Sequence, residues 1–203
     1  GGSDGITVHL REDRRHIQDR DVDLLMKTAR TPVNLELAAR SEILEQAVSW
    51  RPMQSTLVPE NREEVTTEGG LSLTDRAQRD ATETALRALS DEGIRTSLFV
   101  DPDEEAIRIS RELGADAIEL HTGEYANACG PDRNAQIERL VRAARVARDE
   151  GLAVHAGHGL TYENVTPVAA IEEIEELNIG HSIISRSVFL GMERAVREMG
   201  EIL

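Results

Sequence analysis

The sequence predicts a (β/α)₈ TIM barrel, with the first strand and helix unit apparently missing from this chain. Short β-branched segments alternate with amphipathic helical segments, which implies parallel strands joined by right-handed crossovers. Reactive side chains follow nearly every strand, and a barrel brings all such strand ends to one mouth. The rival doubly wound sheet would concentrate them at one switch point. Seven units are found where a barrel needs eight, and such barrels typically have about 250 residues.

Seven short runs of apolar and β-branched residues are expected to be strands. In chain order they cover residues 6–10, 33–37, 55–58, 94–100, 117–121, 152–156 and 177–179. Reactive side chains lie at or just after their ends, including His9, Glu36, Glu60, Asp101, Glu119, His121, His158 and His181. The strand ends therefore predict one shared polar mouth.

The segments between the strands have the spacing of helices that each lay one apolar stripe on a sheet. Apolar residues recur at three and four positions within 137–144 and again within 188–199. Asp101-Pro102 is typical of an N-cap followed by a first-turn proline, and Gly93 and Gly151 are expected just past helix ends.

Composition excludes several classes of protein. The 203 residues include 23 basic and 38 acidic side chains, a formal charge of −15, and one cysteine. A single cysteine cannot build a disulfide scaffold and favours a reducing, cytoplasmic location. The acidic balance argues against nucleic-acid binding, and no apolar run reaches the roughly 18 residues of a membrane span. Without a composition break, residues 1–203 are expected to form one domain.

Two kinds of loop suggest anion binding. Residues 9–16 reverse the sign of an otherwise acidic chain, and arginine suits phosphate or carboxylate. The alternative is a solvated loop in which Glu12 and Asp13 neutralise the arginines. Glycine turns at 156–161 and 178–182 would follow strands 7 and 8 of a complete barrel, where backbone N–H groups commonly hold phosphate.

Acidic and imidazole side chains are candidates for proton transfer. Glu36 and Glu119 lie within apolar strands, where burial would raise the pKa toward that of a general base; each could instead face outward in an ion pair. The three-residue spacing of His155 and His158 leaves a metal site open, although acid–base work by His9 and His158 fits the spread of histidines better. The polar stretch 58–70 ends in Gly-Gly and is expected to be a lid or a connector.

Several strings of the chain closely resemble the pyridoxine 5′-phosphate synthase family, the ring-closing enzymes of vitamin B6 biosynthesis. They are DGITVHLREDRRH at 4–16, NLE at 34–36, LVPE at 57–60, EVTTEGG at 64–70, ELHTG at 119–123, AGHGLTY at 156–162 and ELNIGH at 176–181. The resemblance implies a (β/α)₈ barrel that condenses 1-deoxy-D-xylulose 5-phosphate with 3-amino-2-oxopropyl phosphate. The products would be pyridoxine 5′-phosphate, phosphate and water.

The resemblance also implies a role for each matching residue. His9 and Glu36 would accept protons, His158 would donate one, and Glu119 would stabilise charge in a transition state. The residues for the deoxyxylulose phosphate would be Arg11, His16 and Thr66, and those for the amino-oxopropyl phosphate Gly159, Gly180 and His181. The family suggests small phosphorylated substrates, no metal, no cofactor, and a homo-oligomer, specifically an octamer.

Two departures from the family pattern leave alternatives open. The family's first strand, with an Asn-x-Asp-His string, is absent before Gly1, and His155 stands where Asn is expected. The chain could therefore be an inactive truncated barrel. Another phosphosugar barrel is a weaker alternative, because the only lysine, Lys27, lies on a predicted helix and cannot serve a Schiff-base aldolase at a strand end.

Overall fold

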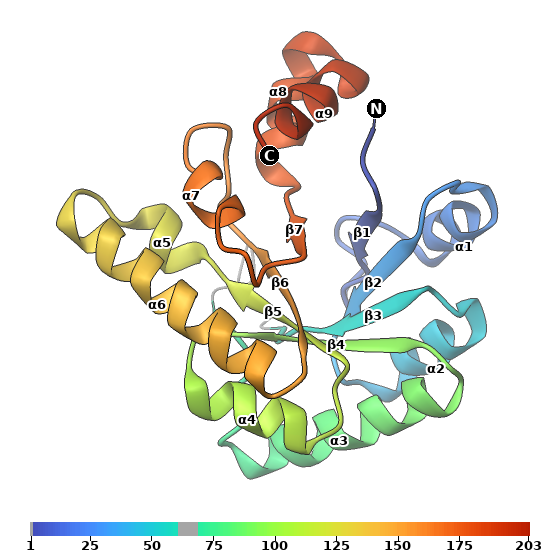
Figure 1. The fold of residues 1–203 in the computed structure, drawn as a ribbon. Helices are drawn as coiled ribbons and strands as arrows, with labels where there is room; N and C mark the ends of the chain where they lie inside the picture. Colours follow the sequence, from blue (N-terminus) through green and yellow to red (C-terminus); the bar gives the residue numbers. More distant parts are fainter. Residues whose placement is uncertain (1, 61–68) are drawn as a thin grey trace.

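A computed structural model describes residues 2–60 and 69–203, in which strands and helices alternate around one sheet (Figure 1). The strands are β1 Ile6–His9, β2 Val33–Leu37, β3 Gln54–Leu57, β4 Arg95–Val100, β5 Ala117–His121, β6 Ala153–Gly157 and β7 Glu176–Asn178. The helices are α1 Asp19–Thr28, α2 Ser41–Trp50, α3 Arg76–Asp91, α4 Glu104–Glu112, α5 Gly123–Asn127, α6 Pro131–Asp149, α7 Thr166–Ala169, α8 His181–Leu190 and α9 Met192–Gly200.

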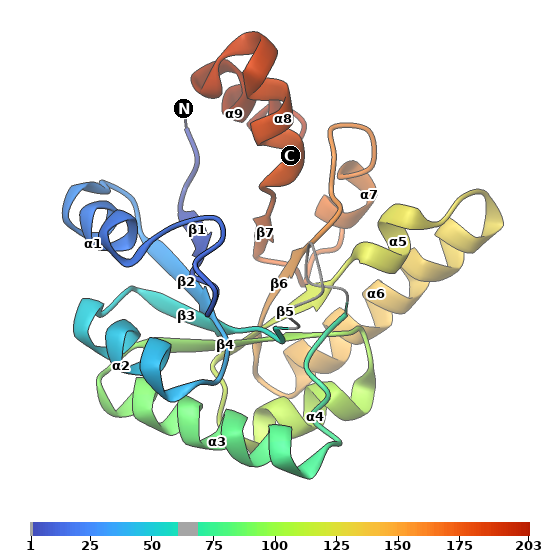
Figure 2. The ribbon, with the colours of Figure 1, turned by 180° about the vertical axis from the view of Figure 1, so that it is seen from behind.

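The sheet runs in the order β1-β2-β3-β4-β5-β6-β7, and every neighbouring pair is parallel. It curls so that β1 and β7, its two edge strands, face each other (Figures 1 and 2). The Thr7 hydroxyl on β1 donates a hydrogen bond of 2.7 Å to Asn178 Oδ1 on β7. The described residues thus form a nearly closed parallel barrel, which confirms the predicted fold class.

The strand register places polar residues on the inside of the barrel. His9 pairs with Glu36 and Glu36 pairs with Thr56, while Glu119 pairs with His155 across β5 and β6. Register partners on adjacent strands point to the same side of a sheet. The alternating residues are apolar and fully buried, among them Leu35, Leu37, Leu57, Leu98, Val100, Ile118, Leu120 and Val154.

The outer layer of helices covers that apolar side of the sheet, as Figure 2 shows from behind. Buried helical residues that join the same core include Val22, Ile43, Ala47, Leu86, Leu89, Ile107, Leu140, Ala144 and Ala147. Burial at three- and four-residue intervals along α6 confirms the predicted stripe in 137–144, although Ile137 and Val141 are only half-buried. The core therefore lies between sheet and helices and leaves the interior of the barrel polar.

Helix ends agree with the sequence in two places and differ in two others. Gly93 and Gly151 follow α3 and α6 with φ of 73° and 78°, as expected for residues just past a helix end. The predicted N-cap at Asp101 is wrong, because Asp103 caps α4 by accepting a hydrogen bond from the N–H of Ala106.

The prediction of one helix with a single apolar stripe over residues 188–199 is also wrong, because two helices cover this range. Gly191, with φ of 80°, separates α8 from α9. Val188 and Met192 are consequently exposed, whereas Ala195 and Met199 on α9 are buried. Among the residues described, no helix has the length and apolar character needed to cross a membrane.

Candidate active site

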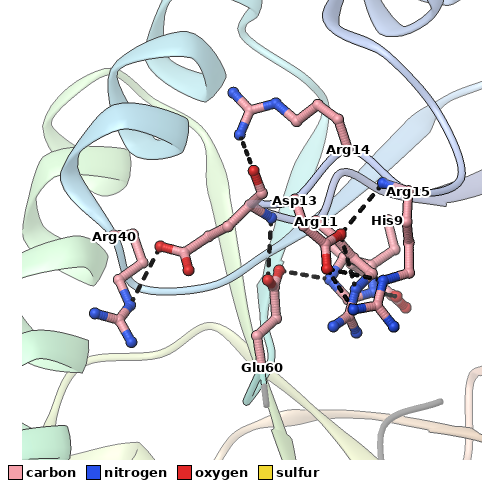
Figure 3. A network of polar contacts seen from close by, with 9 residues as sticks. His9, Arg11, Asp13, Arg14, Arg15, Arg40 and Glu60 are labelled. Carbon is pink, nitrogen blue, oxygen red and sulfur yellow. Dashed lines mark hydrogen bonds and ion pairs between the residues drawn. The ribbon is translucent and has the colours of Figure 1, made fainter. Parts of the chain in front are cut away.

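His9 stands between two carboxylates at the end of β1. Its Nε2 lies 2.9 Å from Oε1 of Glu60, and its Nδ1 lies 3.8 Å from Oε2 of Glu36. The other oxygen of Glu60 accepts a hydrogen bond of 3.0 Å from the N–H of Glu12 (Figure 3). The end of β1 and the segment after β3 are thereby joined around one imidazole.

The two carboxylates differ in pKa because their partners differ. Burial raises the pKa of Glu36, and the charge of His9 only partly opposes this. Burial also raises the pKa of Glu60, but the hydrogen bonds from His9 and from the N–H of Glu12 outweigh it and leave that pKa lowered. Glu60 therefore holds the His9 ring in place as a carboxylate, and the raised pKa of Glu36 makes it the more suitable of the two for exchanging a proton.

The arginines of the cationic segment after β1 pair with carboxylates in two different directions. Arg11 is buried, and its Nε lies 3.5 Å from Oδ1 of Asp13, which also pairs with Arg15 (Figure 3). Arg14 turns away to Asp19 on α1 and to a carboxylate of α2. Asp13 therefore neutralises part of this cluster, as the solvated-loop alternative supposed.

His158 lies across the mouth in a cluster of rings. Its ring is centred 4.7 Å from that of Phe99 and 5.6 Å from that of His121. Burial, followed by the charges of His121 and His9, lowers the pKa of His158 to about 4. The neighbouring His121 is held through Nδ1 by Asp101 Oδ1 at 2.9 Å. His158 is therefore a neutral imidazole at pH 7.

Glu119 is buried on β5, where its two oxygens have different surroundings. Oε2 accepts a hydrogen bond of 2.9 Å from Nδ2 of Asn178 on β7. Oε1 lies beside Gly157, where a methyl group would come within 2.2 Å of it. Burial, Glu36 and Glu176 raise the pKa of Glu119 well above its ordinary value, whereas the bond from Asn178 lowers it.

The two glycine turns lie next to each other. Gly159 has φ of 72°, and a methyl group there would come within 2.6 Å of Cβ of Ala126. Asn164 accepts a hydrogen bond of 2.7 Å from the N–H of Thr161 and donates one of 3.0 Å to the carbonyl of Gly159. Ser182 on α8 donates to the carbonyl of Leu160, so the N-terminus of that helix faces the first turn.

The other predicted binding residues are found at different places. Gly180 is the N-cap of α8, and His181 is its exposed first residue. His16 is exposed in the segment before α1. Thr66 and most of the predicted lid at 58–70 lie outside the described residues.

The predicted catalytic residues act on one another electrostatically. His9 influences Glu36 and His158, and Glu36 influences Glu119. Glu60, Asn178 and Asn164 did not enter the predicted site, although each binds one of its members. Glu60 alone had a usable signal in the sequence, because it follows a strand end. Across residues 2–60 and 69–203, no three His, Cys, Asp or Glu side chains are grouped to hold a metal ion.

The chain forms a nearly closed parallel barrel, and carboxylates, imidazoles and glycine turns meet at the ends of its strands. This is the arrangement of a (β/α) barrel enzyme. Residues 1–203 match the family described as pyridoxal phosphate biosynthesis protein PdxJ. The chain belongs to this family.

Curated relatives agree with the family. The pyridoxine 5′-phosphate synthase of Magnetococcus marinus is 55% identical over 203 residues, covering 100% of this chain and 83% of that protein. The enzyme of the same name from Syntrophotalea carbinolica is 53% identical over 203 residues and is covered to 84%. The chain is accordingly an enzyme of the pyridoxine 5′-phosphate synthase family.

Solved structures support the fold alone. A tryptophan synthase α-subunit from Pyrococcus furiosus matches with a TM-score of 0.59 at 14% identity, over 93% of this chain and 73% of that one. Phosphoribosyl anthranilate isomerase from Thermus thermophilus gives a TM-score of 0.56 at 14% identity, over 88% of this chain and 76% of that one.

Proposed function

We propose that this chain condenses 1-deoxy-D-xylulose 5-phosphate with 3-amino-2-oxopropyl phosphate, giving pyridoxine 5′-phosphate, phosphate and water. Joining an amine to a ketone, losing water and eliminating phosphate each require proton transfers. The observation that carries the proposal is the position of His9 between two carboxylates: its Nε2 lies 2.9 Å from Glu60, and its Nδ1 lies 3.8 Å from Glu36, whose pKa burial raises. A buried carboxylate whose pKa is raised can exchange a proton with substrate near neutral pH.

In this proposal Glu36 and His9 accept protons during the condensation. Glu60 orients His9 by its 2.9 Å contact with Nε2, which leaves Nδ1 on the side of Glu36. The two bases therefore act beside each other. Glu119 stabilises positive charge that develops on the nitrogen-containing intermediate, because a nearby cation favours the ionised form of this buried carboxyl group and interacts strongly with it.

His158 serves as the proton donor once a phosphate has bound. A neutral imidazole is a poor acid, but a phosphate dianion at the adjacent Gly159 favours the imidazolium and raises its pKa. Proton donation would then be coupled to occupancy of the site. Gly159, Gly180 and His181 bind the phosphate of 3-amino-2-oxopropyl phosphate, and the adjacency of the two turns supports this assignment.

Arg11, His16 and Thr66 are proposed to bind the phosphate of the deoxyxylulose substrate. The burial of Arg11 beside the mouth supports its part in this site. The alternative function of a Schiff-base aldolase would need a lysine at the mouth. The only lysine of the chain, Lys27, lies exposed on α1 and pairs with Asp23, so this alternative is not supported.

The proposal is tested by incubating the protein with both substrates and measuring pyridoxine 5′-phosphate and released phosphate. We expect the two products in equal amounts, and none when either substrate is omitted. Circular dichroism serves as the control that the assayed protein is folded. Failure of the folded protein to form product would refute the proposed reaction.

A further inference from the structure

A continuous chain of side-chain hydrogen bonds crosses the interior of the barrel from β3 to β5. Oγ1 of Thr56 donates to Oδ1 of Asn34 at 3.0 Å, and Nδ2 of Asn34 donates to Oγ1 of Thr7 at 3.4 Å. Oγ1 of Thr7 donates to Oδ1 of Asn178 at 2.7 Å, and Nδ2 of Asn178 donates to Oε2 of Glu119 at 2.9 Å. Four bonds therefore link residues that are up to 171 positions apart in the sequence.

In its ionised form, Glu119 fixes the direction of every bond in this chain. A carboxylate only accepts hydrogen bonds, so Asn178 must present Nδ2 to it and turn Oδ1 toward Thr7. Thr7 has one hydroxyl proton, which it gives to Asn178, so it can only accept from Asn34. Aligned hydrogen bonds of this kind polarise and strengthen one another.

We propose that Asn178 is a positioning residue for Glu119, and that Thr7 holds the Asn178 amide in the orientation that presents its N–H group to the carboxylate. The bond holds Oε2, while Oε1 lies beside Gly157, the last residue of β6, which directly precedes His158 in the chain. This inference rests on the proposed role of Glu119 in the reaction. It also gives a function to the hydrogen bond between Thr7 and Asn178, which joins the two edge strands β1 and β7. Through this bond, Thr7 on β1 orients the side chain that holds Glu119 on β5.

The surroundings of Glu119 make this donor important. Glu36 from β2 and Glu176 from β7 face it with like charge, and its register partner on β6 is His155. Burial and the two carboxylates favour the neutral form of Glu119, whereas the N–H of Asn178 favours the ionised form. Loss of that donor is therefore expected to make Glu119 bind its proton at higher pH.

The test compares Thr7→Val with Thr7→Ser. Valine has nearly the shape of threonine but lacks the hydroxyl, so the Asn178 amide loses the bond that orients it. We expect kcat to fall about 10-fold with little change in KM, as when an interaction made only in the transition state is lost. The acid limb of the kcat profile should move to higher pH, and Thr7→Ser should restore both kcat and the limb.

Thr74→Val makes the same chemical change at an exposed position and serves as the control. Circular dichroism and thermal melting of all variants separate loss of folding from loss of positioning. If Thr7→Val and Thr7→Ser lower activity equally, or the acid limb stays where it is in wild type, the positioning role is wrong.

A second measurement is independent of turnover. Infrared difference spectra follow protonation of Glu119 in the substrate-free protein, with Glu119→Gln identifying its carboxyl band. We expect this band to appear at higher pH in Asn178→Ala and Thr7→Val than in wild type. If wild type forms no product, the proposed reaction fails, yet this titration still decides the inference. Identical titrations in wild type and both variants would overturn it.

Discussion

Replacing Gly157 with alanine tests how closely β6, Glu119 and β7 are fitted together. A methyl group on Gly157 would lie 2.2 Å from Oε1 of Glu119 and 3.0 Å from the carbonyl oxygen of Asn178. Ordinary contacts of this kind exceed about 3.4 Å. The carboxylate or the edge strand must therefore move.

The size of the effect follows from what has to move. Inserting a methylene into a packed interior typically costs about 1–3 kcal/mol. Moving Glu119 away instead sacrifices its bond from Asn178, and hydrogen bonds to charged groups contribute about 1.5–3 kcal/mol. Since the less costly movement is enough to relieve the overlap, we expect a loss of about 1–3 kcal/mol in unfolding free energy. At roughly 2–4 °C per kcal/mol, Tm should fall by about 2–12 °C.

Turnover should fall further than stability suggests. Displacement of a catalytic group by about 1 Å can cost on the order of 100-fold in rate. Calorimetry gives Tm, and the two-substrate assay gives kcat. Gly200→Ala is the matched control, because a methyl group there meets no atom within 4 Å and alanine suits α9. Wild-type Tm and kcat in Gly157→Ala would refute the packing described around Glu119.

Two further predictions concern the loop after β6. The pKa of His158 is about 4 in the folded protein, below its usual 6.5, so the unfolded chain takes up this proton first and stability falls as pH drops from about 6.5 to about 4. In urea titrations His158→Asn should lose less stability over that interval than wild type, and an equal loss contradicts the assignment. Asn164→Ala removes both hydrogen bonds that the Asn164 side chain makes to the Gly159 turn. We expect KM for 3-amino-2-oxopropyl phosphate to rise about 10-fold, with a smaller change in kcat. An unchanged KM would show that the turn does not bind this phosphate.

The sequence predicts features whose causes are local. Gly93 and Gly151 end helices because a left-handed residue is needed there, and β-branched runs mark the strands. Gly191 was missed because the apolar residues of 188–199 keep helical spacing across the break. The cap at Asp103 could not be distinguished from Asp101 by sequence, because Asp101 is held by His121, a residue of another strand.

The candidate site residues have a signal in the sequence, although their roles stay a prediction. His9, Glu36, Glu119 and His158 are titratable side chains within or just after strands, and the ends of barrel strands meet at one mouth. Their partners depend on how distant strands meet. In the sequence, the neighbours of Asn178 indicate only a glycine turn. Its partners Thr7 and Glu119 lie on strands that are distant in the sequence, so its bond to Glu119 has no local signature.

General-base catalysis by Glu36 is tested by the two-substrate assay of Glu36→Gln beside Glu45→Gln. Glutamine keeps the size of Glu36 but cannot accept a proton, whereas Glu45 is exposed on α2 and outside the mouth. General-base catalysis typically contributes about 100-fold to 10,000-fold in rate. We expect kcat of Glu36→Gln to fall within that range with the fold intact, and Glu45→Gln to match wild type. Wild-type turnover in Glu36→Gln would contradict acid–base catalysis at this mouth.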